Sequence, residues 1–263
     1  MREAVADRCP DLLAACIAGV GEDPFLRVED STRFAQPAIF CASWAAWTAL
    51  DLEPTAAAGH SLGEIAALAA AGAIDVEDAL QLVVLRGRLM AGADADGSML
   101  ALLGGKIADA RAIAGAAGVT VANDNAPGQV VLSGPRERLA RAEDAARERG
   151  RRTLALDVAG AFHSPSMEPA VEPFRRALDE TEIHEGAFPV FSCASTRPFE
   201  DVRAELAAAL TKPVRWRETV VALHEAGGRR FVEVGPGKVL ARLGKRIVPD
   251  CPVETPAAEL AHA

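Results

Sequence analysis

Residues 59–63 read Gly-His-Ser-Leu-Gly and join a short apolar stretch, 56–58, to an alanine-rich helical stretch that ends near Gly72. A GxSxG sequence between a strand and a helix predicts a sharp turn that exposes the serine hydroxyl at the carboxyl edge of a sheet. The N–H groups at the start of the helix then point toward any negative charge that develops there. The pattern therefore favours a nucleophile at Ser61, and a glycine-rich turn with a capping serine is the alternative.

Strand-like and helical stretches alternate through much of the chain, which predicts a parallel sheet covered by helices. One helix is expected to be entered through the Gln-Pro-Ala sequence at 36–38, because proline suits the first helical position. The expected helices lie at 12–20, 40–50, 65–71, 76–90, 167–178, 202–210 and 218–226, and the expected strands at 56–59, 189–191 and 230–234.

Residues 98–158 follow a different order, with strands at 99–103, 119–122, 129–132 and 153–156 and helices at 106–117 and 136–149. The sequence at 123–128, Asn-Asp-Asn-Ala-Pro-Gly, predicts a turn between the middle strands. A βαββαβ order is typical of a ferredoxin-like unit. The prediction is an α/β-hydrolase-like body with a parallel sheet, residues 1–97 and 159–263, into which a ferredoxin-like subdomain, residues 98–158, is inserted.

Composition limits the class of protein and of partner. Of the 263 residues 50% are apolar, which disfavours disorder. No apolar run reaches about 18 residues, and the start lacks a signal peptide's basic head, so we expect a cytoplasmic protein without a membrane partner. The net charge of −9 disfavours nucleic acid. The five cysteines form no CxxC pair, so reduced thiols are expected and no metal site is predicted.

A nucleophilic serine needs a base, and the chain has five histidines. His163 lies in the loop 160–165 just after an expected strand, where active-site groups tend to gather. Its position favours a base, with a histidine that only caps the next helix as the alternative. The other histidines are expected beside the serine but pointing away, on polar surface, or in the C-terminal tail; they are His60, His184, His224 and His262.

Several short segments together carry a resemblance that none of them carries alone. They are Gln-Pro-Ala at 36–38, Gly-His-Ser-Leu-Gly-Glu at 59–64, Arg-Gly-Arg-Leu-Met at 86–90, Gly-Gln-Val-Val-Leu-Ser-Gly at 128–134, Ala-Phe-His-Ser at 161–164, Pro-Val-Arg-Trp at 213–216 and Glu-Val-Gly-Pro-Gly-Lys-Val-Leu at 233–240. In this order they resemble the malonyl-CoA:acyl-carrier-protein transacylases, acyltransferases of fatty-acid and polyketide synthesis. The resemblance extends from about Arg2 to Ile247.

The resemblance implies roles for the residues that would do the chemistry. Ser61 would be acylated and His163 would be its base, with a backbone carbonyl, expected at Arg215, orienting the histidine. The Leu62 N–H would be an oxyanion donor. Arg86 would grip the malonyl carboxylate, because a guanidinium bonds a carboxylate bidentately.

Two further residues are assigned to the substrate pocket by the same resemblance. Phe162 would crowd an α-methyl group on the acyl chain, and Gln36 is expected among the substrate-binding residues. A methyl group in an apolar pocket is worth only about 1–3 kcal/mol, so selectivity for malonyl should be a preference.

The implied reaction passes malonyl from malonyl-CoA through malonyl-Ser61 to the phosphopantetheine thiol of acyl carrier protein, in fatty-acid biosynthesis. It requires no cofactor, and the family leans to a monomer. Three alternatives remain open: an acyltransferase of a polyketide synthase or malonate decarboxylase, a serine thioesterase or other hydrolase, and a truncated inactive homologue that only binds carrier protein.

The start of the chain departs from the family. Its members begin with a buried strand and a Gly-Gln-Gly-Ser-Gln loop whose first glutamine helps form the oxyanion hole. This sequence starts at Met1-Arg2-Glu3, which resembles the helix after that loop. Either the start codon is assigned too late or the form is truncated, and loss of one oxyanion donor costs about 10²–10³ in rate. An in-frame strand and glutamine loop upstream would support the first interpretation.

Overall fold

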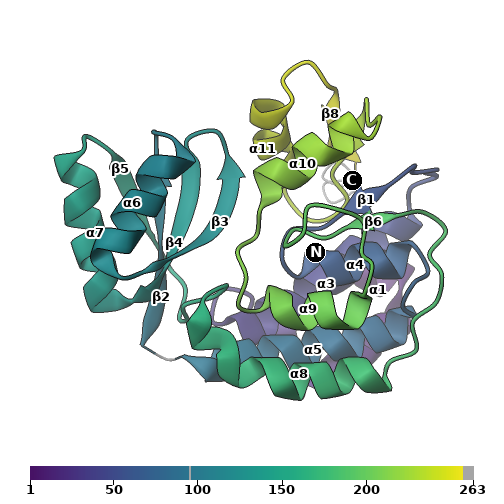
Figure 1. The fold of residues 1–263 in the computed structure, drawn as a ribbon. Coiled ribbons are helices and arrows are strands. Elements are labelled where there is room, and N and C mark those ends of the chain that lie inside the picture. Colours follow the sequence, from purple (N-terminus) through teal and green to yellow (C-terminus); the bar gives the residue numbers. More distant parts are fainter. Residues whose placement is uncertain (95, 257–263) are drawn as a thin grey trace.

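The computed structural model describes residues 1–94 and 96–256. Figure 1 shows a helical body, a separate antiparallel sheet with two helices, and a smaller group of helices and strands near the C-terminus. Across these described ranges, no helix is long and apolar enough to cross a membrane.

The helices of the body pack around one apolar core, with α5 lying against both α3 and α8. Phe40, Leu80 and Phe174 are fully buried there. Local sequence sets the helix ends: α2 begins at Pro10 and ends before Gly21, whose φ of 88° suits glycine. The helices are α1 (Arg2–Arg8), α2 (Pro10–Val20), α3 (Thr32–Thr48), α4 (Gly63–Ala70), α5 (Val76–Ala93), α8 (Glu168–Glu180) and α9 (Val202–Ala209), with short 3₁₀ turns η1 (Pro24–Leu26) and η2 (Pro165–Met167).

Helix α3 begins earlier than expected, so the prediction that it is entered through residues 36–38 was wrong. Ser31 caps it by accepting a hydrogen bond from the N–H of Arg33 at 3.2 Å. Pro37 therefore lies inside the helix. A proline there removes one backbone donor, and the packing of the long apolar helix offsets that loss.

The parallel pairing is confined to short strands. β1 (Ala57–Ala58) pairs with β6 (Val190–Phe191), and Ala57 lies opposite Val190. β7 (Phe231–Val232) pairs with β8 (Val253–Glu254). Helices α10 (Trp216–Glu225) and α11 (Val239–Ile247) contribute to the apolar cluster that contains Phe231. The α/β class with a parallel sheet is confirmed, although these strands are shorter than the sequence indicated.

The antiparallel sheet has the strand order β3-β4-β2-β5, which is the ferredoxin-like arrangement. Its side chains alternate: Leu100 and Leu132 pack with α6 and α7, whereas Met99 and Val131 pack with Phe162 from the body. The proposed subdomain limits, 98 and 158, stay a prediction. The elements are β2 (Gly97–Leu103), α6 (Ile107–Ala117), β3 (Thr120–Ala126), β4 (Gln129–Pro135), α7 (Arg136–Glu148) and β5 (Arg152–Leu156).

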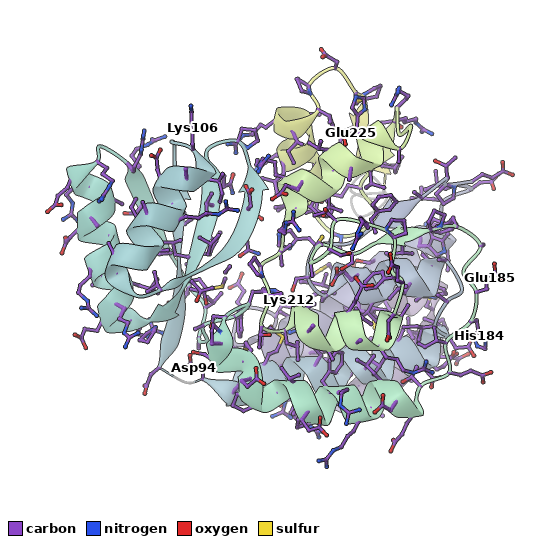
Figure 2. All side chains as sticks on the ribbon, viewed as in Figure 1. Asp94, Lys106, His184, Glu185, Lys212 and Glu225 are labelled. Atoms are coloured by element: carbon purple, nitrogen blue, oxygen red, sulfur yellow. The ribbon has the colours of Figure 1, made fainter. Side chains whose placement is uncertain are left out.

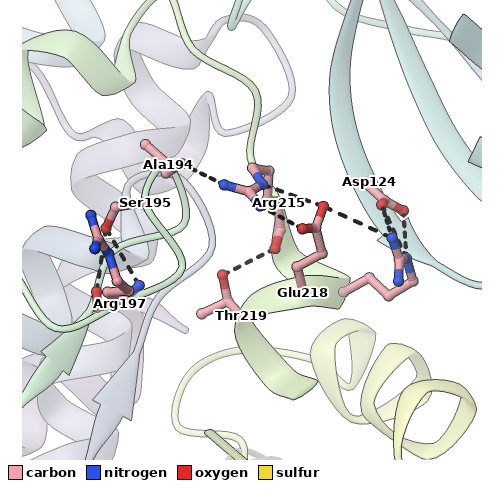
Figure 3. A network of polar contacts seen from close by, with 8 residues as sticks. Asp124, Ala194, Ser195, Arg197, Arg215, Glu218 and Thr219 are labelled. Carbon is pink, nitrogen blue, oxygen red and sulfur yellow. Dashed lines mark hydrogen bonds and ion pairs between the residues drawn. The ribbon is translucent and has the colours of Figure 1, made fainter. Parts of the chain in front are cut away.

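Strand β3 runs on through most of the residues expected to form a turn, leaving Pro127 and Gly128 as the connection to β4. The extra length comes from pairing with the body: the Val214 N–H donates to the Ala122 carbonyl at 2.8 Å, and the Asp124 N–H donates to the Val214 carbonyl at 2.9 Å. Asp124, labelled in Figure 3, also forms an ion pair with Arg217, whose Nη2 lies 2.7 Å from the Asp124 Oδ2. The small sheet is thereby fixed against the start of α10.

Candidate active site

The turn between β1 and α4 is a strained elbow. Ser61 has a φ of 55°, a left-handed conformation that costs a residue with a side chain about 1–3 kcal/mol. A Cβ on Gly59 would lie 1.8 Å from the carbonyl carbon of Gly63, so only glycine fits there. The Glu64 N–H donates to the Ser61 carbonyl at 3.1 Å and begins the helix. Leu62 is the N-cap residue of α4, at the end where N–H groups are available.

Ser61 and His163 meet although 102 residues separate them in the chain. The Ser61 Oγ lies 2.8 Å from the His163 Nε2. On its other side, the His163 Nδ1 donates to the Ala209 carbonyl at 3.0 Å. A proton held on Nδ1 leaves Nε2 free to accept the serine proton, so the carbonyl selects the tautomer that a base needs.

The carbonyl that orients His163 is not the expected one, so the assignment to Arg215 was wrong. Arg215 precedes α10, and its carbonyl accepts from the Thr219 N–H at 2.9 Å and the Thr219 Oγ1 at 3.0 Å (Figure 3). Ala209 instead ends α9, where carbonyls lack partners within the helix. The carbonyl that accepts from His163 is therefore the one at the C-terminus of α9, because the Arg215 carbonyl at the N-terminus of α10 already accepts hydrogen bonds within that helix.

Arg86 projects from α5 to the serine and is 4% exposed. One of its NH groups donates to the Ser61 Oγ at 3.0 Å, and another donates to the Gln36 Oε1 at 2.6 Å. Gln36 is itself held, because its Nε2 donates to the Thr32 Oγ1 at 2.9 Å. Burial lowers the pKa of Arg86 to about 10, and the charge of Glu64 opposes that shift, so the guanidinium is charged at neutral pH.

His163 is neutral at the same pH. Burial first, and then the charge of Arg86, lower its pKa to about 3, while the hydrogen bond to the Ala209 carbonyl acts in the opposite direction. An imidazole in this state has an unprotonated Nε2, whose lone pair can accept a proton, throughout the physiological pH range. The site therefore combines an unprotonated imidazole with a fixed positive charge, both within hydrogen-bond distance of the Ser61 Oγ.

This burial predicts a loss of stability in acid. His163 has an unfolded pKa near 6.5 and a lower folded pKa, so its share of the stability is present above pH 6.5 and is lost as the pH falls toward 3. From about pH 7.5 to 5 the loss is about 2 kcal/mol, and its slope approaches about 1.4 kcal/mol per pH unit below pH 6. In urea unfolding at both pH values, His163→Gln should lose less stability than the wild type. Matching losses in wild type and variant would contradict the prediction, and the half-exposed His184→Gln is the control.

Phe162 and His60 complete the surroundings. Phe162 is half-buried between the body and the small sheet, and a Cβ on Gly160 would lie 2.5 Å from its ring. The His60 Nε2 lies 2.8 Å from the Asn125 Oδ1, and its ring lies 5.7 Å from that of Trp216. Asn125 was missed by the sequence analysis, which placed it in a turn. Asn125 could have been recognised only if β3 had been expected to extend to Ala126, because it would then have been a polar residue within a strand.

The remaining histidines lie apart from Ser61 or outside the described residues. His184 lies at the edge of the body in Figure 2, far from Lys212 near the centre of that view. The His224 Nδ1 contacts the Gly228 carbonyl at 2.9 Å. His262 lies outside the described residues. Among the residues that are described, no three His, Cys, Asp or Glu side chains gather as a metal site.

Comparison with known proteins gives consistent similarities. Residues 25–260 match the family described as the acyl transferase domain. The polyketide biosynthesis protein ThaF of Burkholderia thailandensis is 39% identical over 249 residues, which cover 91% of this chain but only 21% of ThaF. The malonyl CoA-acyl carrier protein transacylase of Bacillus subtilis is 37% identical over 230 residues, covering 81% of this chain and 72% of the relative.

A solved structure is similar over the whole chain. The crystal structure of malonyl CoA-acyl carrier protein transacylase from Clostridium perfringens superposes with a TM-score of 0.91 and 28% identity, covering 100% of this chain and 91% of that one. The similarity thus includes the body and the small antiparallel sheet together.

Proposed function

This chain belongs to the acyl transferase domain family, and from that membership we propose that it transfers malonyl from malonyl-CoA to the phosphopantetheine thiol of acyl carrier protein. The observation that carries the proposal is the buried, charged Arg86 at 3.0 Å from the Ser61 Oγ. A serine hydrolase of simple esters has no use for a buried cation there. An acyl group that ends in a carboxylate does, because the guanidinium can bond it while Ser61 attacks the carbonyl.

The first half-reaction forms the acyl-enzyme. As the Ser61 Oγ attacks the thioester carbonyl, the His163 Nε2 takes its proton, and the Ala209 carbonyl stabilises the resulting imidazolium. The oxyanion would receive the Leu62 N–H at the start of α4. The tetrahedral intermediate then breaks its carbon–sulfur bond, and CoA leaves with the proton from His163.

The second half-reaction runs the same steps with another thiol. The carrier protein's phosphopantetheine sulfur attacks malonyl-Ser61 while the His163 Nε2 removes the thiol proton. Collapse breaks the ester bond and returns the proton to the Ser61 Oγ. Because both halves use one base and one nucleophile, the kinetics should be ping-pong.

The structure bears on one of the rival functions, and the similarity to known proteins bears on another. A thioesterase of the α/β-hydrolase type orients its histidine with an acidic side chain, whereas the His163 Nδ1 here faces the Ala209 carbonyl. Fatty-acid and polyketide carriers offer the same thiol, and the similarity to ThaF keeps a polyketide pathway as the second candidate. We also propose that the reaction takes place in the cytoplasm and that the chain acts as a monomer.

Arg86 provides the test of the proposed substrate. Arg86→Ala should lower kcat/KM for malonyl-CoA but spare acetyl-CoA, because acetyl has no carboxylate to leave unpaired. Charge-assisted hydrogen bonds contribute about 1.5–3 kcal/mol each, so selectivity should change by roughly one to two powers of ten. Arg86→Lys should recover only part of it, since an ammonium cannot make two parallel bonds.

The measurement compares kcat/KM for both thioesters, with acyl carrier protein as acceptor. Arg88→Ala, an exposed position on the same helix, is the matched control and should leave selectivity unchanged. A parallel loss for malonyl-CoA and acetyl-CoA in Arg86→Ala would mean that Arg86 supports the fold, and the malonyl assignment would fail.

A further inference from the structure

Cys193 contacts both arms of the Ser61 turn. Its thiol donates to the Gly59 carbonyl at 3.2 Å, on the strand side of the serine. Its backbone N–H donates to the Glu64 Oε1 at 2.6 Å, on the helix side. Cys193 and Glu64 are each 2% exposed, so both bonds lie in the protein interior. We call these two residues the clamp.

The fold places the clamp without any sequence motif. Strand β6 pairs with β1, and Cys193 follows β6 as Gly59 follows β1, so the two residues meet at the carboxyl ends of neighbouring parallel strands. The Cys193 carbonyl accepts from the Arg215 N–H at 2.9 Å, so the clamp is also tied to the start of α10. Every backbone polar group of Cys193 is therefore used.

The protonation states of Cys193 and Glu64 are compatible with these two hydrogen bonds. Burial, and then the charge of Glu64, raise the pKa of the Cys193 thiol well above its usual range, so the thiol keeps the proton that it donates. Burial raises the pKa of Glu64 to about 7, while the Cys193 N–H and the charge of Arg86 act in the opposite direction. In either protonation state, Glu64 retains an oxygen that can accept from the Cys193 N–H.

A strained residue keeps its conformation only when its surroundings hold it. Ser61 is such a residue, and the hydrogen bonds within the turn and α4 all run along one stretch of chain. The clamp adds bonds from a distant segment on both sides of it. We propose that Cys193 is a positioning residue that, through Gly59 and Glu64, holds the Ser61 Oγ in line with His163 and the thioester carbonyl. This rests on the proposed role of Ser61 as nucleophile.

The test compares Cys193→Ser, which keeps a donor for the Gly59 carbonyl, with Cys193→Ala, which removes it. Cys41→Ala, at a fully buried thiol on α3, is the control for loss of a buried thiol. Three measurements are made for each protein: the single-turnover rate of Ser61 acylation over a range of malonyl-CoA concentrations, which gives the maximal rate and KM; the rate of labelling by a fluorophosphonate; and the thermal unfolding midpoint.

Misplacement of a reacting group by about 1 Å can cost about 10²-fold in rate, so a loss of about tenfold or more is expected for Cys193→Ala, with KM nearly unchanged. Cys193→Ser should recover most of that rate, and Cys41→Ala should retain it. The order of the variants by rate should be the same with malonyl-CoA and with the fluorophosphonate. Equal rates for Cys193→Ser and Cys193→Ala would overturn the proposal, as would a loss that appears only in KM.

The two reagents separate this proposal from the proposed function. Wild-type protein that reacts with the fluorophosphonate but not with malonyl-CoA would refute the malonyl assignment, and the order of the fluorophosphonate rates would still decide the role of Cys193. If Cys193→Ala fails to fold, Glu64→Gln and Glu64→Leu replace the pair. Gln can still accept from the Cys193 N–H, so it should react faster than Leu, and equal rates would overturn the clamp.

Discussion

The variant Ser61→Ala should take up no malonyl group from malonyl-CoA, whereas the wild type should gain one per chain. The alanine has no oxygen to form the ester, and no other serine on the described residues has both His163 and Arg86 within hydrogen-bond distance. Loss of a nucleophile of this kind costs up to about 10⁶ in rate. The expected result is complete loss of transfer to acyl carrier protein.

Intact-protein mass spectrometry after incubation with malonyl-CoA measures the effect directly, and peptide mapping locates the added group. Ser195→Ala is the matched control, because Ser195 lies in a loop and bonds only to its own neighbours. A mass increase that persists in Ser61→Ala would remove the serine from the mechanism.

The second large effect is expected from His163→Ala. Without the imidazole, nothing removes the Ser61 proton during attack, and loss of a general base costs about 10²–10⁴ in rate. The loss should appear in kcat for both half-reactions, because the same Nε2 serves both. Single-turnover acylation and transfer to carrier protein measure them separately.

His224→Ala and His184→Ala are the controls for His163→Ala. His224 bonds the Gly228 carbonyl at the end of α10, and His184 is half-exposed, so neither should slow the reaction much. Similar losses at His163 and His224 would show that the base has been misidentified. Thermal unfolding of each variant separates loss of the base from loss of the fold.

The elbow and its neighbours were the most predictable part of the molecule. Glycines at 59 and 63, a short apolar stretch before them and an alanine-rich stretch after them leave few alternatives to a strand–turn–helix. Short continuous apolar runs also located β2 and β4, because one face of each strand packs on helices and the other on the body. Such features depend on residues close together in the chain.

Features that depend on distant partners could not be predicted. Nothing near Ala209 in the sequence marks its carbonyl as the partner of His163, since any residue has a carbonyl. The length of β3 depends on Val214, and the contact of His60 with Asn125 follows from that length. Cys193 likewise gains its contacts only through the pairing of β6 with β1. Contacts made by backbone groups, and the pairing of very short strands, leave no pattern of side chains in the sequence from which they could be predicted.

The pairing of β1 with β6 also orders events during synthesis on the ribosome. The segment from β2 to β5, Gly97–Leu156, is continuous and is complete before Val190 is translated. Domains generally fold as units from the N-terminal side as the chain emerges, so the small sheet can form while β1 still lacks its partner. The elbow gains the neighbour of β1, and then Cys193, only after residues 190–193 have been translated. Until then Ser61 lacks both the strand partner and the Cys193 contact that hold its turn, so under the proposed function its reactivity should arise late in translation.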